Sequence, residues 1–418
     1  MSHDIVKTLF ACAAAVSAAF GASFSSYGVP WKDGSPEPVN VPSVLMHQST
    51  DPAVWENVRR PELYGVFMRE EYGVRPAAAD DRSRVNFKVA DEREAMDGKA
   101  VRKLVDITYS GPCGQLTFRA TAFIPKSAKP SPAFILICNR SPKTNGGVNP
   151  IDPDRKDRSG FWPAEEIVRR GYAAITFFNG DVAPDDSKGD CRKGIFPCVE
   201  PHEKRNDSSW ATLSAWAWGA SKVMDWIETE KTIDAKHVAV VGHSRGGKTA
   251  LLAGVTDKRF AMACSNDSGC SGAKLNHIKL PKSESIKAIT KNFPHWFCRN
   301  YRKYAGKEME MHFDQNQFIA LIAPRLVAIA SATEDDWAGQ RGEWQAAKLA
   351  SEAWTLYGRK EGLAADSYPP PETPQQEGSI SYHLRTGKHN LTEYDWKCYM
   401  DFADRHGWTK RCVTTPRR

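Results

Sequence analysis

The sequence predicts an α/β protein in which a mostly parallel sheet carries helices on both faces. Short apolar runs alternate along the chain with segments of helical period, and this alternation is typical of parallel strands joined by crossover helices. A hydrophobic content of 41% in 418 residues is enough for a large core. No repeat with a period of about 20 to 50 residues is visible, which excludes a solenoid.

The predicted elements follow in chain order. Residues 28–60 are rich in Pro and polar residues and are predicted to be an extended N-terminal segment. Strands are predicted at Val101–Tyr109, Gln115–Phe123, Ala133–Cys138, Ala173–Phe178, His237–Val241, Phe260–Cys264, Leu326–Ser331 and Ser379–Arg385. Helices are predicted at Ala164–Arg170, Ser209–Glu228, Lys248–Gly254, Trp344–Tyr357 and Thr392–Arg405.

The charge balance disfavours nucleic-acid binding. The 57 Lys and Arg residues against 50 Asp and Glu give a net charge of +7, and no run of basic residues is long enough to follow a phosphate backbone. Neither a CxxC pair nor a Cys/His cluster with zinc spacing occurs. We therefore predict no nucleic-acid partner, no metal and no cofactor.

The first 22 residues are predicted to be a secretory signal. No charged residue lies between Lys7 and Lys32, and Leu9–Ala22 is an apolar run of mostly small residues, which suits the apolar core of a signal. A buried helix and a lipoprotein signal at Cys12 are the alternatives. The prediction is export to the periplasm or the medium, with no membrane segment after cleavage.

Residues 23–418 are predicted to form one domain, and we expect a monomer. Signal removal would leave nine of the ten cysteines, and in an oxidising compartment several could pair. Cys191 with Cys198, and Cys398 with Cys412, are close enough in sequence to do so. Nine is odd, so at least one thiol is expected to stay free or to pair between molecules.

The chemistry is concentrated in Gly242-His243-Ser244-Arg245-Gly246, where a predicted strand ends and a helix begins. In this context G-x-S-x-G is typical of a serine nucleophile, because small neighbours permit a tight turn that lifts the hydroxyl above the sheet edge. The helix directs its positive end at that hydroxyl, and the backbone N–H of Arg245 is a natural oxyanion donor. The pattern predicts Ser244 as the nucleophile of an α/β-hydrolase, with an ordinary strand-to-helix turn as the alternative.

The general base is predicted to be His389. In this fold the acid and then the histidine follow the serine along the chain. His389 lies in a polar loop directly after the last predicted strand. His383 lies within that strand and is expected to pack or hydrogen-bond there. The histidines that lie between Ser244 and the penultimate strand are His277, His295 and His312.

Two positions compete for the acid. Asp335, next to Asp336, follows the penultimate strand, which is the usual place for this residue. Asp267 follows the strand before it. Either carboxylate could orient the histidine, and the other would then cap or order a loop. The residues alone leave this choice open.

Six motifs follow one another along the chain. They are Gly242-His243-Ser244-Arg245-Gly246-Gly247-Lys248, Asn266-Asp267-Ser268-Gly269-Cys270-Ser271-Gly272-Ala273, Pro294-His295-Trp296-Phe297, Ala320-Leu321-Ile322-Ala323-Pro324-Arg325, Glu334-Asp335-Asp336-Trp337-Ala338 and Gly387-Lys388-His389. In this order they resemble the bacterial glucuronoyl esterases of carbohydrate esterase family 15. The likeness also touches Arg60-Pro61-Glu62-Leu63 and Tyr72-Gly73, so it covers nearly the whole chain after residue 22.

The resemblance implies hydrolysis of the ester that joins 4-O-methyl-glucuronic acid on xylan to lignin alcohols. The implied substrate is glucuronoxylan or a lignin–carbohydrate ester. The resemblance also implies that the Arg245 side chain assists the oxyanion hole, that Lys248 and Glu284 contact sugar hydroxyls, and that Trp337 lines the uronate pocket.

The resemblance also bears on the acid. Family members carry it after either strand, and where the earlier position is used it is typically Glu. Asp267 is one methylene shorter, so the resemblance favours Asp335.

The complete fold prediction is a three-layer α/β-hydrolase with a partial cap. The cap is assigned to the residues between Asp267 and Ala320, which are inserted over the carboxyl edge of the sheet, where open α/β sheets bind ligands. Two other functions stay open: another carbohydrate ester hydrolase, such as an acetyl xylan or pectin methyl esterase, and a catalytically silent polysaccharide-binding homologue.

Overall fold

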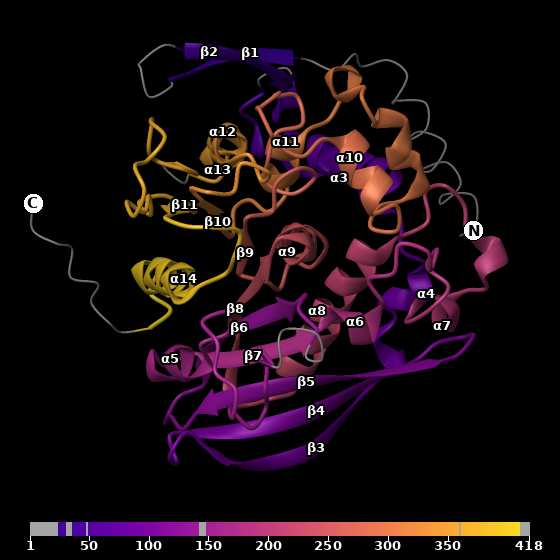
Figure 1. Ribbon diagram of the computed structural model, residues 1–418, viewed down its shortest axis with the longest axis vertical. Helices are drawn as coiled ribbons and strands as arrows, with labels where there is room; N and C mark the ends of the chain where they lie inside the picture. Colours follow the sequence, from indigo (N-terminus) through magenta and orange to yellow (C-terminus); the bar gives the residue numbers. More distant parts are fainter. Residues whose placement is uncertain (1–23, 31–35, 47–48, 142–147, 359–360, 410–418) are drawn as a thin grey trace, which may run out of the picture.

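The computed structural model describes residues 24–30, 36–46, 49–141, 148–358 and 361–409 (Figure 1). The predicted signal of residues 1–22 and two cysteines, Cys12 and Cys412, lie outside these ranges. Within them, no helix combines the length and the apolar character needed to cross a membrane.

A nine-stranded sheet forms the centre of the molecule. Its strands are β3 (Val85–Ala95), β4 (Ala100–Ser110), β5 (Gln115–Pro125), β6 (Ser131–Cys138), β7 (Ala173–Phe178), β8 (Ile233–His243), β9 (Met262–Asn266), β10 (Leu326–Ala332) and β11 (Ile380–Arg385). They lie in the order β11-β10-β9-β8-β6-β7-β5-β4-β3. The strands from β11 to β7 pair in parallel, whereas β5, β4 and β3 join antiparallel. The predicted mostly parallel sheet is confirmed.

The helices and the sheet form three layers. The helices are α2 (Pro52–Val54), α3 (Arg60–Phe67), α4 (Ala77–Asp80), α5 (Ala164–Arg169), α6 (Asn179–Val182), α7 (Phe196–Val199), α8 (Thr212–Ile227), α9 (Arg245–Thr256), α10 (Ile286–Asn292), α11 (Gln315–Ala320), α12 (Gln340–Ala350), α13 (Glu352–Thr355) and α14 (Glu393–Arg405). Side chains of β6 alternate between two cores: Ile137 packs in the core that contains α8 and α9, and Phe134 in the core that contains α5 and α14.

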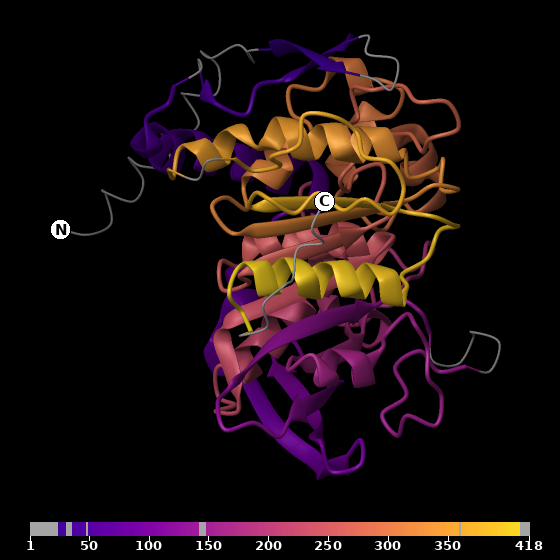
Figure 2. The ribbon, with the colours of Figure 1, turned by 90° about the vertical axis from the view of Figure 1, so that its left-hand side faces the viewer.

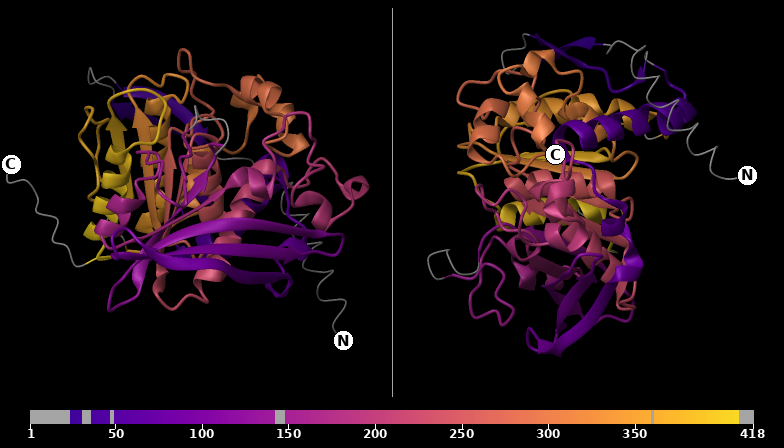
Figure 3. Two further views of the ribbon diagram at one scale, coloured as in Figure 1. Left: turned by 60° about the horizontal axis from the view of Figure 1, so that its bottom comes forward. Right: turned by 90° about the vertical axis from the view of Figure 1, so that its right-hand side faces the viewer.

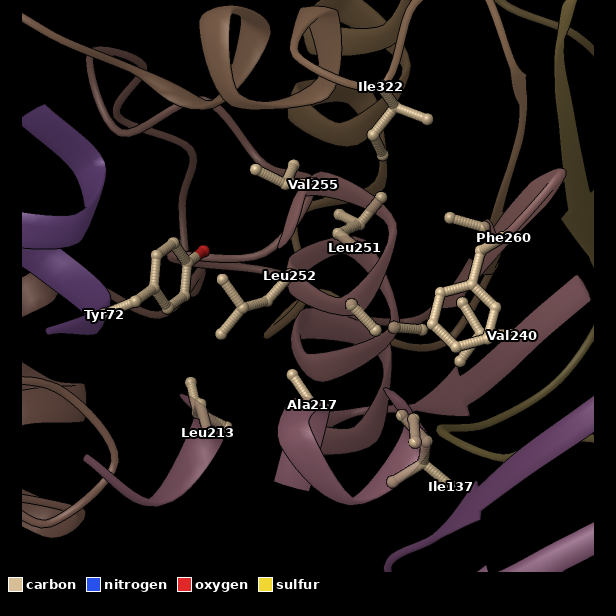
Figure 4. Packing of buried hydrophobic residues seen from close by; sticks show 14 of the residues in the cluster. Tyr72, Ile137, Leu213, Ala217, Val240, Leu251, Leu252, Val255, Phe260 and Ile322 are labelled. Carbon is tan, nitrogen blue, oxygen red and sulfur yellow. The ribbon is translucent and has the colours of Figure 1, made fainter. Parts of the chain in front are cut away.

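The figures show both cores. Figure 2 shows α14 lying across one face of the sheet. Figure 4 shows the other face, where Leu251 and Leu252 of α9 lie among side chains that include Val240 of β8 and Tyr72. The predicted α/β-hydrolase architecture is therefore confirmed, and it fixes the carboxyl ends of β8, β9 and β10 next to one another.

One prediction near the N-terminus is wrong, and one strand there was missed. Residues 52–60 are helical rather than extended, because Pro52 occupies the first turn of α2 and the Asp51 side chain accepts from the Ala53 N–H at 2.8 Å. A π-helical turn, Trp55–Arg59, continues this helix into α3. The edge strand β3 was not predicted, since its apolar alternation is confined to Val85, Phe87 and Val89 and is followed by mostly charged, exposed residues.

The chain between β9 and β10 forms the predicted partial cap, which carries α10 and α11 (Figure 1 and Figure 3). Asp314 caps α11 with a reciprocal capping box. The same carboxylate accepts from Asn276 N–H at 2.7 Å and lies 2.8 Å from His277 Nδ1. One buried aspartate therefore joins the beginning of the cap to its end.

The eight cysteines in the described ranges form no disulfide. The pairing of Cys191 with Cys198, which their spacing allowed, is therefore not formed. The helical turn α7 places Cys198 against the β4–β5 hairpin, where the Cys198 carbonyl accepts from Cys113 N–H at 3.1 Å. The possible Cys398–Cys412 pairing is not tested, because Cys412 lies outside the described residues.

Candidate active site

The turn at Ser244 joins β8 to α9 at the carboxyl edge of the sheet. Ser244 has φ 57° and ψ −123°, a conformation that is strained for a residue with a side chain. Its N–H donates to Asn266 O at 2.8 Å. A Cβ added at Gly242 would lie 1.9 Å from Gly246 O, so only glycine fits there. These features are those of a nucleophile elbow, with the serine at the N-terminus of α9.

His389 lies beside this elbow, in the loop after β11. Its ring centre is 4.4 Å from that of His243, the residue before Ser244. Its Nδ1 lies 2.5 Å from Asp335 Oδ2, the length of a strong charge-assisted bond. In the described part of the chain no hydrogen bond joins the ring to Ser244. Such bonds often form only once substrate is bound.

The two candidate acids occupy different environments. Asp335 is close to Nδ1 of His389, as described. Asp267 has its Oδ2 3.4 Å from Asn390 N and 3.5 Å from Arg385 Nη2, so it contacts the loop that carries His389 rather than the ring nitrogen. Burial, and then the charges of Glu343 and Asp335, raise the pKa of Asp267 well above its ordinary range.

Glu343 of α12 ties these loops together and was missing from the sequence-based prediction. It accepts from Gly269 N–H at 2.8 Å, from Ser268 Oγ at 3.1 Å and from Ser331 Oγ at 2.6 Å. Burial raises its pKa to about 6. Glu343 thereby joins the loop after β9 to the end of β10, the strand that precedes Asp335.

The side chain of Arg245 projects from the first residue of α9. Its guanidinium donates to Asp185, and its Cζ lies 4.9 Å from the centre of the Trp296 ring. The side chain is 30% exposed. A cation held at the start of this helix adds to the positive field around Ser244. Sequence reasoning did not identify Asp185, although Trp296 stood in one of the motifs.

Lys248, Glu284 and Trp337 form one contiguous group. The buried Lys248 Nζ donates to Ser268 O and to Cys270 O, and lies 3.7 Å from Glu284 Oε2. The Glu284 N–H donates to Trp337 O at 2.9 Å, which links the cap to the loop that bears Asp335. The Trp337 side chain is 50% exposed. A buried charged pair beside an exposed aromatic ring suits recognition of a polar ring.

A hollow of about 450 Å³ opens next to the loop that carries Asp335. Its walls come from that loop, from the cap and from the loop before β11: Leu280, Pro281, Lys282, Thr333, Asp336, Gly339, Gln340, Arg341, Tyr368, Pro369, Pro371 and Leu384. None of the proposed triad residues Ser244, Asp335 and His389 lines this hollow, so it lies beside the site.

Among the described residues, one set of side chains has the spacing of metal ligands. Asp267, Asp335 and His389 bring one ligand atom each within 4.8 Å of one another. Asp335 and His389 already bond each other, and Asp267 faces Arg385. The prediction of no metal stays a prediction.

The structure brings every sequence-predicted site residue to the same region of the molecule. His383, expected to be structural, lies 3.0 Å from Asp395 through its Nε2 and is buried. The residues that sequence reasoning missed, Asp185 and Glu343, come from segments without a motif of their own. Only their contacts with Arg245 and with the loop after β9 identify them.

The relatives that comparison with known proteins finds are named as glucuronoyl or carbohydrate esterases. The family described as "Glucuronyl esterase, fungi" matches residues 107–358. Carbohydrate esterase MZ0003, from an unknown prokaryotic organism, is 35% identical over 382 residues, covering 84% of this chain and 85% of that protein. The 4-O-methyl-glucuronoyl methylesterase 1 of Phanerochaete chrysosporium is 25% identical over 61% of this chain and 50% of its own length.

Two solved structures have the same fold over almost their entire length. A promiscuous CE15 esterase from a marine bacterial metagenome has a TM-score of 0.77 and 33% identity, and covers 93% of this chain and 98% of that chain. The glucuronoyl esterase from Solibacter usitatus has a TM-score of 0.76 and 34% identity, with 91% and 98% coverage.

Proposed function

This chain belongs to the glucuronoyl esterases of carbohydrate esterase family 15, and on that premise we propose that it hydrolyses 4-O-methyl-glucuronoyl esters that link glucuronoxylan to lignin alcohols. The observation that carries the proposal is the elbow at Ser244 with the His389–Asp335 pair, 2.5 Å apart, beside it. The curated 4-O-methyl-glucuronoyl methylesterases among its relatives support the acyl group.

In the proposed reaction Ser244 is the nucleophile. His389 removes the proton from Oγ as Oγ attacks the uronate carbonyl carbon, and it later gives that proton to the departing alcohol. The second half repeats these steps with water, which releases the uronic acid and frees Ser244. Asp335 holds the Nδ1–H of His389 and stabilises the imidazolium that forms in both halves.

The oxyanion of the tetrahedral intermediate is assigned to Arg245. Its backbone N–H begins α9, and its guanidinium adds a full positive charge where negative charge develops. Lys248 and Glu284 are assigned to the sugar hydroxyls, and Trp337 to the sugar face. These four assignments rest on the family and on the grouping described above.

The site chemistry does not select the acyl group, so the experiment compares two substrates. Release of alcohol from benzyl or methyl glucuronate is measured beside hydrolysis of p-nitrophenyl acetate, for the wild type and for Ser244→Ala. We expect glucuronate turnover that Ser244→Ala abolishes. Acetate turnover without glucuronate turnover would favour an acetyl xylan or related esterase. No turnover of either ester by the wild type would favour a silent binding homologue.

We also propose export. Residues 1–22 are assigned as a removable signal and residues 23–418 as a single domain that acts as a monomer in the periplasm or the medium. The charge-free apolar run up to Ala22 supports this. N-terminal sequencing of the protein recovered from a bacterial host tests it: a mature chain that still begins at residue 1 would contradict the assignment.

A further inference from the structure

Asp185 receives three hydrogen bonds from residues around the elbow. It lies in the loop after α6. His295 Nε2 lies 2.7 Å from Oδ1, Trp296 Nε1 donates to the same oxygen at 2.8 Å, and Arg245 Nη1 donates to Oδ2. A carboxylate surrounded by three donors is held in one orientation. The Asp185 side chain is nevertheless 26% exposed, so it lies at the rim of the site.

The donors of this cluster are themselves fixed. His295 and Trp296 are buried, and their carbonyls accept from Thr212 N–H at 3.0 Å and Leu213 N–H at 3.2 Å, at the first turn of α8. These bonds satisfy donors that a helix start otherwise leaves unpaired. The segment 295–296 is therefore anchored to the core, and it offers Asp185 a rigid frame.

Arg245 is confined on two sides. Its guanidinium lies over Trp296, with Cζ 4.9 Å from the ring centre, and 5.6 Å from the Phe293 ring centre. These two rings stack on each other at 3.9 Å with an angle of 3° between their planes. The aromatic face limits the guanidinium in one direction, and Asp185 limits it along the Nη1 edge.

Part of the Arg245 guanidinium stays open to an incoming group. Its Nε is buried and has no hydrogen-bond partner among the described residues, whereas the side chain as a whole is 30% exposed. The exposed part of the guanidinium is therefore the part that a substrate oxygen can reach.

We infer that Asp185 is a positioning residue that fixes the Arg245 guanidinium on Trp296 so that its exposed part is held ready for the substrate oxyanion. This inference rests on the proposed function. Asp185 does not touch the ester. It acts through Arg245, and its contribution disappears when Arg245 is absent.

The Asp185 carboxylate stays ionised over the pH range in which the enzyme is assayed. Burial would raise the pKa of this carboxyl, but the hydrogen bond from His295, the charge of Arg245 and the bond from Trp296 outweigh it and lower the pKa to about 2. The bond to Arg245 is therefore between ions at any pH at which an ester hydrolase is assayed.

The test is a double-mutant cycle between Asp185 and Arg245, measured as kcat and KM for methyl glucuronate. Asp185→Asn keeps the shape and one acceptor oxygen but removes the charge. We expect kcat to fall about tenfold with KM changed less than about twofold, since a loosened oxyanion donor acts mainly on the transition state. Asp186→Asn is the matched control. Asp186 is the neighbouring carboxylate, 3.8 Å from Lys193, and this variant is expected to keep full activity.

The cycle separates positioning from a purely structural role. Arg245→Ala is expected to lower kcat about 10²-fold to 10³-fold. Adding Asp185→Asn to it should then change kcat less than about twofold, because coupled residues are not additive. A further tenfold loss in the Arg245→Ala background would overturn the inference, as would an unchanged kcat in Asp185→Asn alone. Repeating the cycle with Asp185→Ser keeps the result independent of the folding of one variant.

Failure of this inference is distinguishable from failure of the proposed function. If the function is wrong, wild-type glucuronate turnover is absent or survives Ser244→Ala. If only the inference is wrong, turnover still depends on Ser244, while Asp185 and Arg245 give additive effects or Asp185 gives none.

Discussion

Replacing Asp335 by Asn tests whether Asp335, rather than the nearby Asp267, is the acid of the proposed triad. The change keeps the side-chain shape and removes the negative charge opposite Nδ1 of His389, 2.5 Å away. The amide no longer stabilises the imidazolium, and it can favour the wrong tautomer of the ring. Activity should therefore fall through kcat, with little change in KM.

The size of the fall follows from the surroundings of His389. In a serine hydrolase with a single buried acid the same change lowers kcat by about 10⁴-fold. Here His389 is 42% exposed, so solvent replaces part of the lost interaction. Asp267 also brings a carboxylate oxygen into the same group of atoms, all within 4.8 Å. We expect a loss of about 10²-fold to 10³-fold, equivalent to about 2.7 to 4 kcal/mol in the barrier.

The assay is kcat/KM for benzyl glucuronate, with thermal unfolding measured in parallel. Asp267→Asn is the matched variant, because Asn tolerates the positive φ of 45° at this position. We expect it to lose less than about threefold alone, but to lower the residual activity of Asp335→Asn further. The reasoning is refuted if Asp335→Asn stays within about threefold of the wild type while Asp267→Asn loses 100-fold or more, since that pattern would assign the acid to Asp267.

Three further predictions address other parts of the molecule. Trp337→Ala should raise KM for methyl glucuronate several-fold and leave the melting temperature within about 1 °C, because the side chain is 50% exposed; an unchanged KM would contradict its assignment. Gly242→Ala should abolish activity and lower stability, since its Cβ would lie 1.9 Å from Gly246 O; an active, stable variant would contradict the elbow geometry. Burial raises the pKa of Glu71 to about 8, so its protonated form favours the folded state, and this contribution is lost as pH rises towards 8. Between pH 6 and 8 the wild type should lose about 2 kcal/mol of unfolding free energy that Glu71→Gln retains; parallel pH profiles in urea unfolding would refute this.

Much of the sheet could be predicted because its strands are buried on both faces. The largely apolar run Ala173–Phe178 became β7 with the same bounds, since nearly all of its side chains are buried. The strand β3 lies at the edge of the sheet, and its apolar alternation is limited to Val85, Phe87 and Val89 before a mostly charged stretch. The helical stretch from Pro52 was hidden by its polar composition, because its stability comes from a cap and from packing rather than from its own residues.

The site likewise contains residues that the sequence could predict and residues that it could not. Ser244 and His389 were predictable because a local turn and the order along the chain determine them. Asp185 and Glu343 were not, because each acts through contacts with segments more than 50 residues away. The residues alone left the choice between Asp267 and Asp335 open, since both follow strands that end at the same edge, and only the family resemblance favoured Asp335.

Four carboxylates lie around this edge of the sheet, and their surroundings shift the pKa values of three of them in different directions. Asp185 faces His295, Arg245 and Trp296, and its pKa falls to about 2. Asp267 and Glu343 are buried beside other carboxylates, and their pKa values are raised. Three ionised carboxylates within a few ångströms in a buried region would repel one another strongly. Raising the pKa values of the two that do not contact His389 reduces this repulsion. Asp335 then stands as the carboxylate bonded to the ring, which is why replacements at 335 and 267 should differ.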